Sequence, residues 1–202
     1  MKEQLTVGSM FAGIGGICLA FRQNGCKIVW ANEIDRYACK TYRLNFGDEY
    51  LIEGDIQKLD TKDIPKFDIL TAGFPCQAFS SVGLLEGFND PRGNLFFETA
   101  RVINKIKPRV VFLENVANLV KHDEGRTFDV ILKTLGDLGY YTVYKVMNAK
   151  EYGNIPQQRN RIYIVAFKYK KNVEKFKFPD MLPLTQTAFD LFDKKKQEEK
   201  YY

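Results

Sequence analysis

The sequence has no long apolar run. No stretch of its 202 residues approaches the roughly 20 apolar residues that a membrane-spanning helix needs. The first residues, Met1 to Gln4, do not resemble a signal peptide and lead directly into a strand-like run. These absences argue against a membrane protein and against a secreted one, so we expect a cytoplasmic location.

Metal-binding patterns are also scarce. The chain has one histidine, His122, and four cysteines, none of them paired in a Cys-x-x-Cys spacing. Structural zinc sites draw on such pairs of cysteines and histidines, so no metal site is expected. Without an export signal, the four thiols are expected to stay free in a reducing cytosol.

The composition is that of one folded domain with a substantial core. Hydrophobic residues make up 45% of the chain and charged residues 27%, which is ordinary for a globular protein of this length. The net charge is +5, and residues 168–202 contribute +3 of it, from nine lysines and six acidic residues. This weak basic excess is compatible with nucleic-acid binding but does not require it.

Apolar strand-like runs alternate with helical patterns along the chain. The expected strands cover residues 5–11, 27–31, 50–53, 67–72, 109–113, 140–146 and 161–167. Apolar residues at helical spacing cover residues 17–25, 37–44, 95–106 and 127–138. The alternation predicts an α/β fold with a doubly wound, mostly parallel sheet and helices on both faces. We expect one main domain over residues 1–168 and a charged C-terminal extension over residues 169–202.

Three features at the ends of predicted strands suit an adenosine-type ligand. A glycine-rich turn, residues 11–16, follows the first strand, Glu33 follows the second and Asp55 follows the third. Ligands of doubly wound sheets bind at the carboxyl ends of the strands. Glu33 lies about 20 residues after the turn, the offset at which an acidic residue holds ribose hydroxyls, and Asp55 is placed to accept from an adenine amino group. The alternative is a packing turn followed by solvated acids.

One cysteine, Cys76, follows an apolar strand and the turn Gly73–Pro75. Glycine and proline set the backbone angles at this exit, so we expect the thiol to be presented at the mouth of the strand as a nucleophile. The other three cysteines, Cys18, Cys26 and Cys39, lie in helix or strand patterns. They fit the usual role of a free cysteine as a small buried apolar side chain.

Further polar residues adjoin two later strands. Glu114 ends an apolar run, and a carboxyl group at the edge of a buried strand can act as an acid near neutral pH. The alternative is a carboxylate paired with Arg159 or Arg161. These two arginines point to the same face at the start of the last strand. There they suit a phosphate or a carboxylate, or they are solvated.

The order of these motifs along one chain resembles a known family. The order is the turn 11–16, Glu33, then Gly73-Phe74-Pro75-Cys76-Gln77, then Glu114-Asn115-Val116, then Gln158-Arg159-Asn160-Arg161. The likeness extends from about residue 5 to residue 167 and includes the segments 90–96 and 148–153. The sequence is similar to the DNA cytosine-5 methyltransferases of bacterial restriction–modification systems.

The resemblance implies a Rossmann-like methyltransferase fold with S-adenosyl-L-methionine as cofactor, so that residues 1–168 form the catalytic and cofactor-binding domain. The positions that it places at the cofactor are Phe11, Ala12, Gly13, Gly15, Gly16, Glu33, Ile34, Asp55, Ile56 and Pro75. It also implies four catalytic positions. The Cys76 thiolate adds to carbon-6 of cytosine, Glu114 acts at ring nitrogen 3, Arg161 orients the base and the thiol, and Arg159 supports the site.

The resemblance further implies duplex DNA as substrate, with the target base flipped out of the stack. The residues that it places at the DNA are Gln77, Ser80, Ser81 and Val82. Family members continue into a target recognition domain and a final helix, so a second subunit supplying these parts is an expected partner, and a cognate restriction endonuclease is another.

Several alternatives stay open from the sequence. The chain can be a truncated form. It can also be a non-catalytic protein that binds the cofactor or a partner, or an RNA cytosine-5 methyltransferase of similar architecture.

Overall fold

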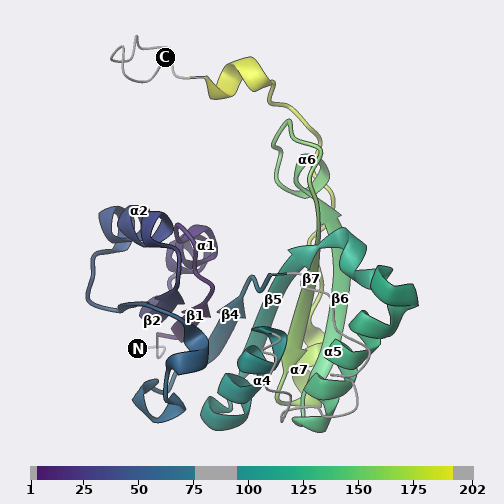
Figure 1. The fold of residues 1–202 in the computed structure, drawn as a ribbon. Helices are drawn as coiled ribbons and strands as arrows, with labels where there is room; N and C mark the ends of the chain where they lie inside the picture. The colour runs from purple at the N-terminus through teal and green to yellow at the C-terminus, as the bar shows by residue number, and fades with distance from the viewer. Residues whose placement is uncertain (1–3, 76–94, 193–202) are drawn as a thin grey trace.

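A single seven-stranded sheet forms the centre of the molecule (Figure 1). The computed structural model describes residues 4–75 and 95–192. The strands lie side by side in the order β3-β2-β1-β4-β5-β7-β6. Their bounds are β1 (Thr6–Met10), β2 (Lys27–Glu33), β3 (Leu51–Glu53), β4 (Ile69–Ala72), β5 (Val110–Val116), β6 (Tyr141–Asn148) and β7 (Asn160–Phe167). β7 is antiparallel to both of its neighbours, and the other paired strands are parallel.

Helices connect most of these strands. The α-helices are α1 (Gly16–Gln23), α2 (Arg36–Phe46), α4 (Leu95–Ile106), α5 (Arg126–Asp137), α6 (Ala149–Tyr152) and α7 (Lys170–Lys175). Short 3-10 helices are η1 (Ile56–Lys58), η2 (Thr61–Asp63), η4 (Ala117–Val120), η5 (His122–Gly125) and η6 (Ala188–Leu191). In the part of the chain that the structure describes, no helix is long and apolar enough to cross a membrane.

Two apolar clusters cover the two faces of the sheet. On one face α1 and α2 supply Cys18, Cys39 and Tyr42, which pack against strand residues such as Val7 and Ala31. The opposite face carries the larger cluster, in which α4 and α5 are packed on β4 and β5. Its helical members recur at the spacing of one helix face, as in Phe128, Ile131 and Leu135 of α5. The predicted doubly wound α/β fold is confirmed.

The strand order creates a crevice at one edge of the sheet. From β1 the chain moves outward to β2 and β3, and then returns to the other side of β1 as β4. The connections after β1 and β4 therefore leave in opposite directions, which makes this the point where doubly wound sheets bind ligands. The predicted ligand-binding turn after β1 and the turn 73–75 after β4 both lie here.

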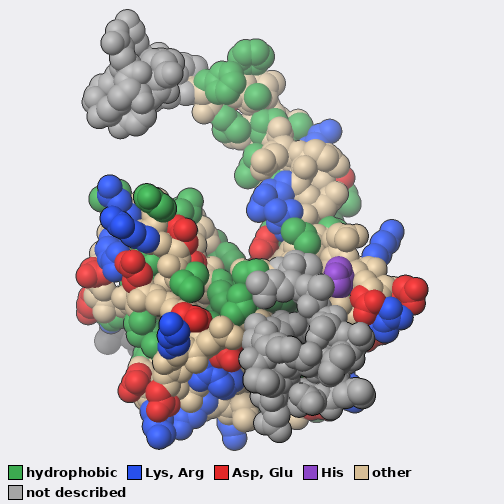
Figure 2. Space-filling model, in the orientation of Figure 1, with side chains coloured by type: hydrophobic (Ala, Val, Ile, Leu, Met, Phe, Trp, Pro, Cys, Tyr) green, Lys and Arg blue, Asp and Glu red, His purple; other side chains and the backbone are tan. Residues whose placement is uncertain are grey.

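The chain beyond residue 168, which carries α7 and η6, contacts the rest of the molecule in part. The ring of Phe176, after α7, lies 5.3 Å from that of Phe167, and the Leu182 amide donates to the Glu151 carbonyl at 2.7 Å. The segment then runs past α6 and ends in η6, away from the sheet (Figure 1). Hydrophobic side chains gather on this arm (Figure 2): exposed residues are Met181, Leu182, Leu184, Phe189, Leu191 and Phe192. The division at residue 168 stays a prediction.

Phe67, just before β4, packs tightly against Gly8 in β1, and this contact can be tested by substitution. A Cβ at Gly8 in β1 would lie 2.2 Å from Cε1 of Phe67, a ring that is itself stacked on Trp30. We expect Gly8→Ala to lower the free energy of unfolding by about 1–3 kcal/mol because the ring must shift. Chemical denaturation of the variant measures this.

Gly136 in α5 supplies the control, because a Cβ there meets no atom within 4 Å. Gly136→Ala is expected to raise the unfolding free energy by about 0.5–1 kcal/mol, the usual difference between glycine and alanine inside a helix. An unchanged stability of Gly8→Ala would contradict the close packing of Phe67 on β1.

Candidate active site

A pocket of about 220 Å³ lies at the carboxyl ends of β1 to β4. Six of the residues predicted to bind the cofactor line it, together with four that were not predicted to bind the cofactor. The ten lining residues are Phe11, Asn32, Glu33, Ile34, Gly54, Asp55, Ile56, Gly73, Pro75 and Leu95. The structure thus brings together residues from five separate chain segments.

The turn after β1 forms one side of the pocket through Phe11. Its backbone is left-handed at Phe11 (φ 51°), Gly13 (φ 56°) and Gly15 (φ 94°). Glycine is required at position 15, because a Cβ there would lie 2.3 Å from the ring of Phe46. The predicted cofactor residues Ala12, Gly13, Gly15 and Gly16 do not themselves line the pocket. Gly13 instead supports a residue that does.

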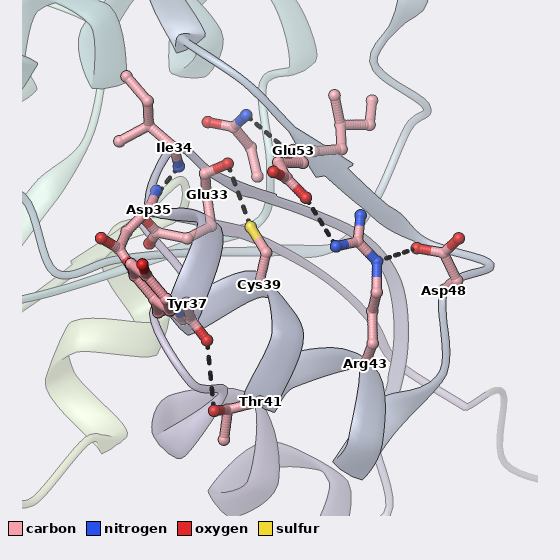
Figure 3. A network of polar contacts seen from close by, with 12 residues as sticks. Glu33, Ile34, Asp35, Tyr37, Cys39, Thr41, Arg43, Asp48 and Glu53 are labelled. Atoms are coloured by element: carbon pink, nitrogen blue, oxygen red, sulfur yellow. Dashed lines mark hydrogen bonds and ion pairs between the residues drawn. The ribbon is translucent and has the colours of Figure 1, made fainter.

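Glu33 links this turn to the end of β2. It is the last residue of β2, and its carboxylate accepts three backbone N–H groups. Figure 3 shows Glu33 with its sequence neighbours Ile34 and Asp35. Gly13 donates to Oε2 at 2.7 Å, while Ile34 and Asp35 donate to Oε1 at 2.9 Å each. Hydrogen bonds to an ionised carboxylate are among the stronger ones in proteins. A carboxylate has about four acceptor positions, so Glu33 can also accept from ligand hydroxyls.

Asp55 and Ile56 form another wall of the pocket. Asp55 caps η1, because its Oδ1 accepts from the Gln57 amide at 3.0 Å. The second carboxylate oxygen has no partner among the described residues and can accept a ligand donor. Ile34 and Ile56 add apolar surface; Ile34 is 64% exposed. A planar ring with an amino group at its edge fits this combination.

A half-buried ion pair lies beside the turn 73–75. Nε of Arg161 in β7 is 2.9 Å from Oε1 of Glu114 in β5, and the two side chains are 21% and 23% exposed. Of the two arginines considered from the sequence, Arg161 is therefore the partner of Glu114. Arg159 is exposed and makes no ion pair within the described residues. Oε2 of Glu114 lies 3.4 Å from where a Cβ of Gly73 would be, so the carboxylate borders the pocket lining.

Tyr163 is the cross-strand neighbour of Glu114. Burial raises the pKa of the Tyr163 phenol, and the negative charge of Glu114 raises it further. The ring lies 5.7 Å from that of Phe112. The neutral phenol therefore adds no negative charge that would compete with Glu114 for Arg161.

Asn115 holds the turn that leads to the predicted nucleophile. Its Nδ2 donates to the Phe74 carbonyl at 2.9 Å, and its Oδ1 accepts from the Val116 amide at 2.8 Å. The side chain is 5% exposed. Asn115 belongs to a motif quoted from the sequence, but no role was predicted for it. Its partner, Phe74, is 41 residues away in the chain, which no local pattern encodes.

The predicted nucleophile and DNA-contacting residues lie outside the described residues: Cys76, Gln77, Ser80, Ser81 and Val82. Pro75, the sequence neighbour of Cys76, lines the pocket. Over residues 4–75 and 95–192 no group of three or more His, Cys, Asp or Glu side chains is arranged to hold a metal ion.

Comparison with known proteins decides the family. Residues 5–202 match the family described as C-5 cytosine-specific DNA methylase. The chain belongs to this family. Its relatives include the Type II methyltransferase M.Bsp6I of Bacillus sp. (strain RFL6), 48% identical over 98% of this chain and 64% of the relative. Another is the Type II methyltransferase M.HhaI of Haemophilus parahaemolyticus, 47% identical over 90% of this chain and 55% of the relative.

Solved structures of methyltransferases share the fold of this family member. The Dnmt2 methyltransferase of S. pombe superposes with a TM-score of 0.68 at 26% identity, over 83% of this chain and 51% of that one. The methyltransferase EhMeth of Entamoeba histolytica gives 0.71 at 22% identity, over 97% and 62%. The chain thus spans about half to two thirds of the length of these relatives and neighbours.

Removal of the Asn115 amide tests its hold on the turn 73–75. In Asn115→Ala the buried Phe74 carbonyl loses its donor, so we expect the free energy of unfolding to fall by about 1–3 kcal/mol. Asn45→Ala is the control, because the exposed Asn45 amide donates to the Thr41 carbonyl within its own helix. Equal, small losses in the two variants, measured by urea denaturation, would show that Asn115 does not hold the turn.

Proposed function

We propose that this chain carries the cofactor site and the reacting groups of a DNA cytosine-5 methyltransferase. The observation that supports this most is that Glu33, Asp55 and Pro75 line one pocket and that the Glu114 carboxylate lies beside it. Family membership supplies the reaction class, and the pocket supplies groups suited to its cofactor.

The residues of the pocket fit S-adenosyl-L-methionine. Glu33, held by three backbone amides, accepts the two ribose hydroxyls. Ile34 packs on the adenine ring, and Asp55 accepts from its amino group. Phe11 and the following glycine turn flank the ligand from β1, and Pro75 borders its reactive end. When bound, the cofactor supplies an electrophilic methyl group on a sulfonium.

The proposed reaction makes carbon-5 of cytosine nucleophilic. The Cys76 thiolate forms a bond to carbon-6, and Glu114 protonates or hydrogen-bonds ring nitrogen 3 so that the ring becomes an enamine. S-adenosyl-L-methionine, held by Glu33, Ile34 and Asp55, would supply the methyl group to the activated carbon-5 and would leave as S-adenosylhomocysteine. Loss of the carbon-5 proton to a base expels the thiolate and restores the carbon-5–carbon-6 double bond, and ring nitrogen 3 returns its proton to Glu114.

Arg161 orients Glu114 for this step. The Arg161 guanidinium binds Oε1 of Glu114, and Oε2 lies toward Gly73 and is available to the substrate. A carboxyl group fixed by one oxygen presents the other to the substrate in a defined direction. Arg159 is exposed and lies two residues before Arg161. We propose that its positive charge supports the site by attracting the DNA phosphates.

Duplex DNA is the proposed substrate, and the target cytosine must be flipped out because carbon-5 and carbon-6 are otherwise inside the stack. Gln77, Ser80, Ser81 and Val82 are proposed to contact the DNA near the vacated position. The relatives are longer than this chain, so target recognition is proposed to need further polypeptide, as a continuation or a second subunit. A cognate restriction endonuclease is proposed from the Type II names of the relatives.

Asp55 gives a direct test of cofactor binding. Asp55→Asn keeps an acceptor that can cap η1 but removes the charge, so we expect the Kd for S-adenosylhomocysteine to rise about 10-fold, as for a lost hydrogen bond to a charged group. Calorimetric titration measures the Kd. Asp60→Asn is the control, because Asp60 caps η2 in the same way and lies outside the pocket. Equal effects of the two substitutions would argue against the assigned role.

Covalent capture tests the nucleophile. The chain, supplemented with a polypeptide that covers the remaining length of the relatives, is incubated with cofactor and duplex DNA containing 5-fluorocytosine. We expect a denaturation-resistant adduct, because fluorine cannot leave carbon-5 as a proton does, and the thiolate stays bonded.

Cys76→Ser should abolish the adduct, and Cys26→Ser, a half-buried cysteine in another part of the chain, should not. An adduct formed by Cys76→Ser would refute the assignment. An adduct with structured RNA but not with duplex DNA would favour an RNA methyltransferase, and no adduct despite cofactor binding would favour a non-catalytic protein.

A further inference from the structure

The wall of the pocket that carries Asp55 has little support from the sheet. β3 is an edge strand of three residues and pairs with β2 only through Leu51–Glu53. Beyond Glu53 the Gly54 amide still donates to the Glu33 carbonyl at 2.8 Å, and the chain then turns away as Asp55 and η1. The position of Asp55 and η1 must therefore be fixed by contacts other than the strand ladder.

Side chains from two other elements donate hydrogen bonds to the backbone carbonyls of this wall. Asn32 of β2 donates through Nδ2 to the carbonyls of Ile52 and Gly54, at 3.0 and 2.9 Å. On the other side of Asp55, Arg101 of α4 donates through Nη2 to the Ile56 carbonyl at 2.8 Å and through Nη1 to the Leu59 carbonyl at 3.0 Å. Asp55 thus lies between two sets of fixed carbonyls.

Arg101 is itself held in place. Its Nε and Nη2 lie 2.7 and 2.6 Å from Oε2 of Glu98, one turn earlier on α4. The Arg101 and Glu98 side chains are 33% and 19% exposed. A planar guanidinium can bind one carboxylate and two carbonyls at once, which the single ammonium of a lysine cannot do with the same geometry.

Arg101 does not line the pocket, whereas Asn32 does. An effect of Arg101 on a ligand must therefore pass through the wall that it holds. α4 also begins with Leu95, which lines the pocket directly. The helix α4 thus supplies the lining residue Leu95 at its start and, about two turns later, Arg101, which binds the wall that carries Asp55.

We propose that Arg101 is a positioning residue for ligand selectivity. It fixes Asp55 and Ile56 so that the site distinguishes a 6-aminopurine nucleoside from a 6-oxopurine one. The proposal rests on the proposed function, since it takes the ligand of this pocket to be the adenosyl cofactor. The 6-oxo group of hypoxanthine cannot donate to the Asp55 carboxylate, so the selectivity depends on where that carboxylate is held.

The experiment compares two ligands, S-adenosylhomocysteine and S-inosylhomocysteine, by calorimetric titration of the 202-residue chain and of Arg101→Met. We expect the wild type to prefer the adenosyl ligand by at least about 10-fold, the value of one charged hydrogen bond. In Arg101→Met that ratio should fall to within about threefold of unity, mainly by weaker adenosyl binding. Arg101→Lys should be intermediate.

Two controls separate positioning from general destabilisation. Arg126→Met removes another arginine paired with an acid three residues earlier, Asp123, away from the pocket. It should leave the ratio unchanged. Glu98→Gln keeps Arg101 but weakens its anchor, so it should lower the ratio in part, and it serves if Arg101→Met does not fold.

The outcomes are distinct. Wild type that binds neither ligand refutes the proposed function, and this inference with it. Wild type that discriminates, with an unchanged ratio in the Arg101 and Glu98 variants, refutes the inference alone. A uniform loss of affinity for both ligands, with the ratio kept, also refutes it, because that is the signature of a merely structural residue.

Discussion

The hydrogen bonds from three backbone amides to the Glu33 carboxylate fix the ligand-binding edge of the molecule. They connect the turn after β1 to the end of β2, beside the last backbone hydrogen bond between the two segments, from the Ala12 amide to the Asn32 carbonyl. The left-handed backbone of the turn, at Gly13 and Gly15, aims the Gly13 amide at the carboxylate. The remaining walls of the pocket are arranged around this contact.

Where the strands end, side chains take over from the ladder. Asn32, Arg101 and Asn115 each donate to backbone carbonyls just beyond a strand of the sheet. A buried carbonyl without a donor costs free energy, so these amides and the guanidinium satisfy groups that would otherwise need water. The same contacts fix the loops in which the ligand-facing residues Asp55 and Pro75 lie.

The antiparallel direction of β7 explains how Arg161 reaches the site. Because β7 runs opposite to β5, its first residues lie beside the last residues of β5, with Arg161 opposite Val116 and Tyr163 opposite Glu114. A parallel β7 would begin at the other edge of the sheet. One reversed strand therefore brings a cation from late in the chain to a carboxylate at the carboxyl edge, next to the turn after β4.

The sequence by itself determined the alternation of strands and helices and the residues at the strand ends, because periodicity and glycine turns are local signals. It predicted Glu33 and Asp55 at one edge, since parallel strands share a carboxyl edge, and the resemblance added Phe11 and Pro75; all four line one pocket. Only the tertiary structure chose Arg161 over Arg159 as the partner of Glu114, and only it showed the contacts of Asn115 and Arg101. Those contacts join residues 41 to 47 positions apart in the chain. The acceptors of Asn115 and Arg101 are backbone carbonyls, and a carbonyl leaves no mark in the sequence.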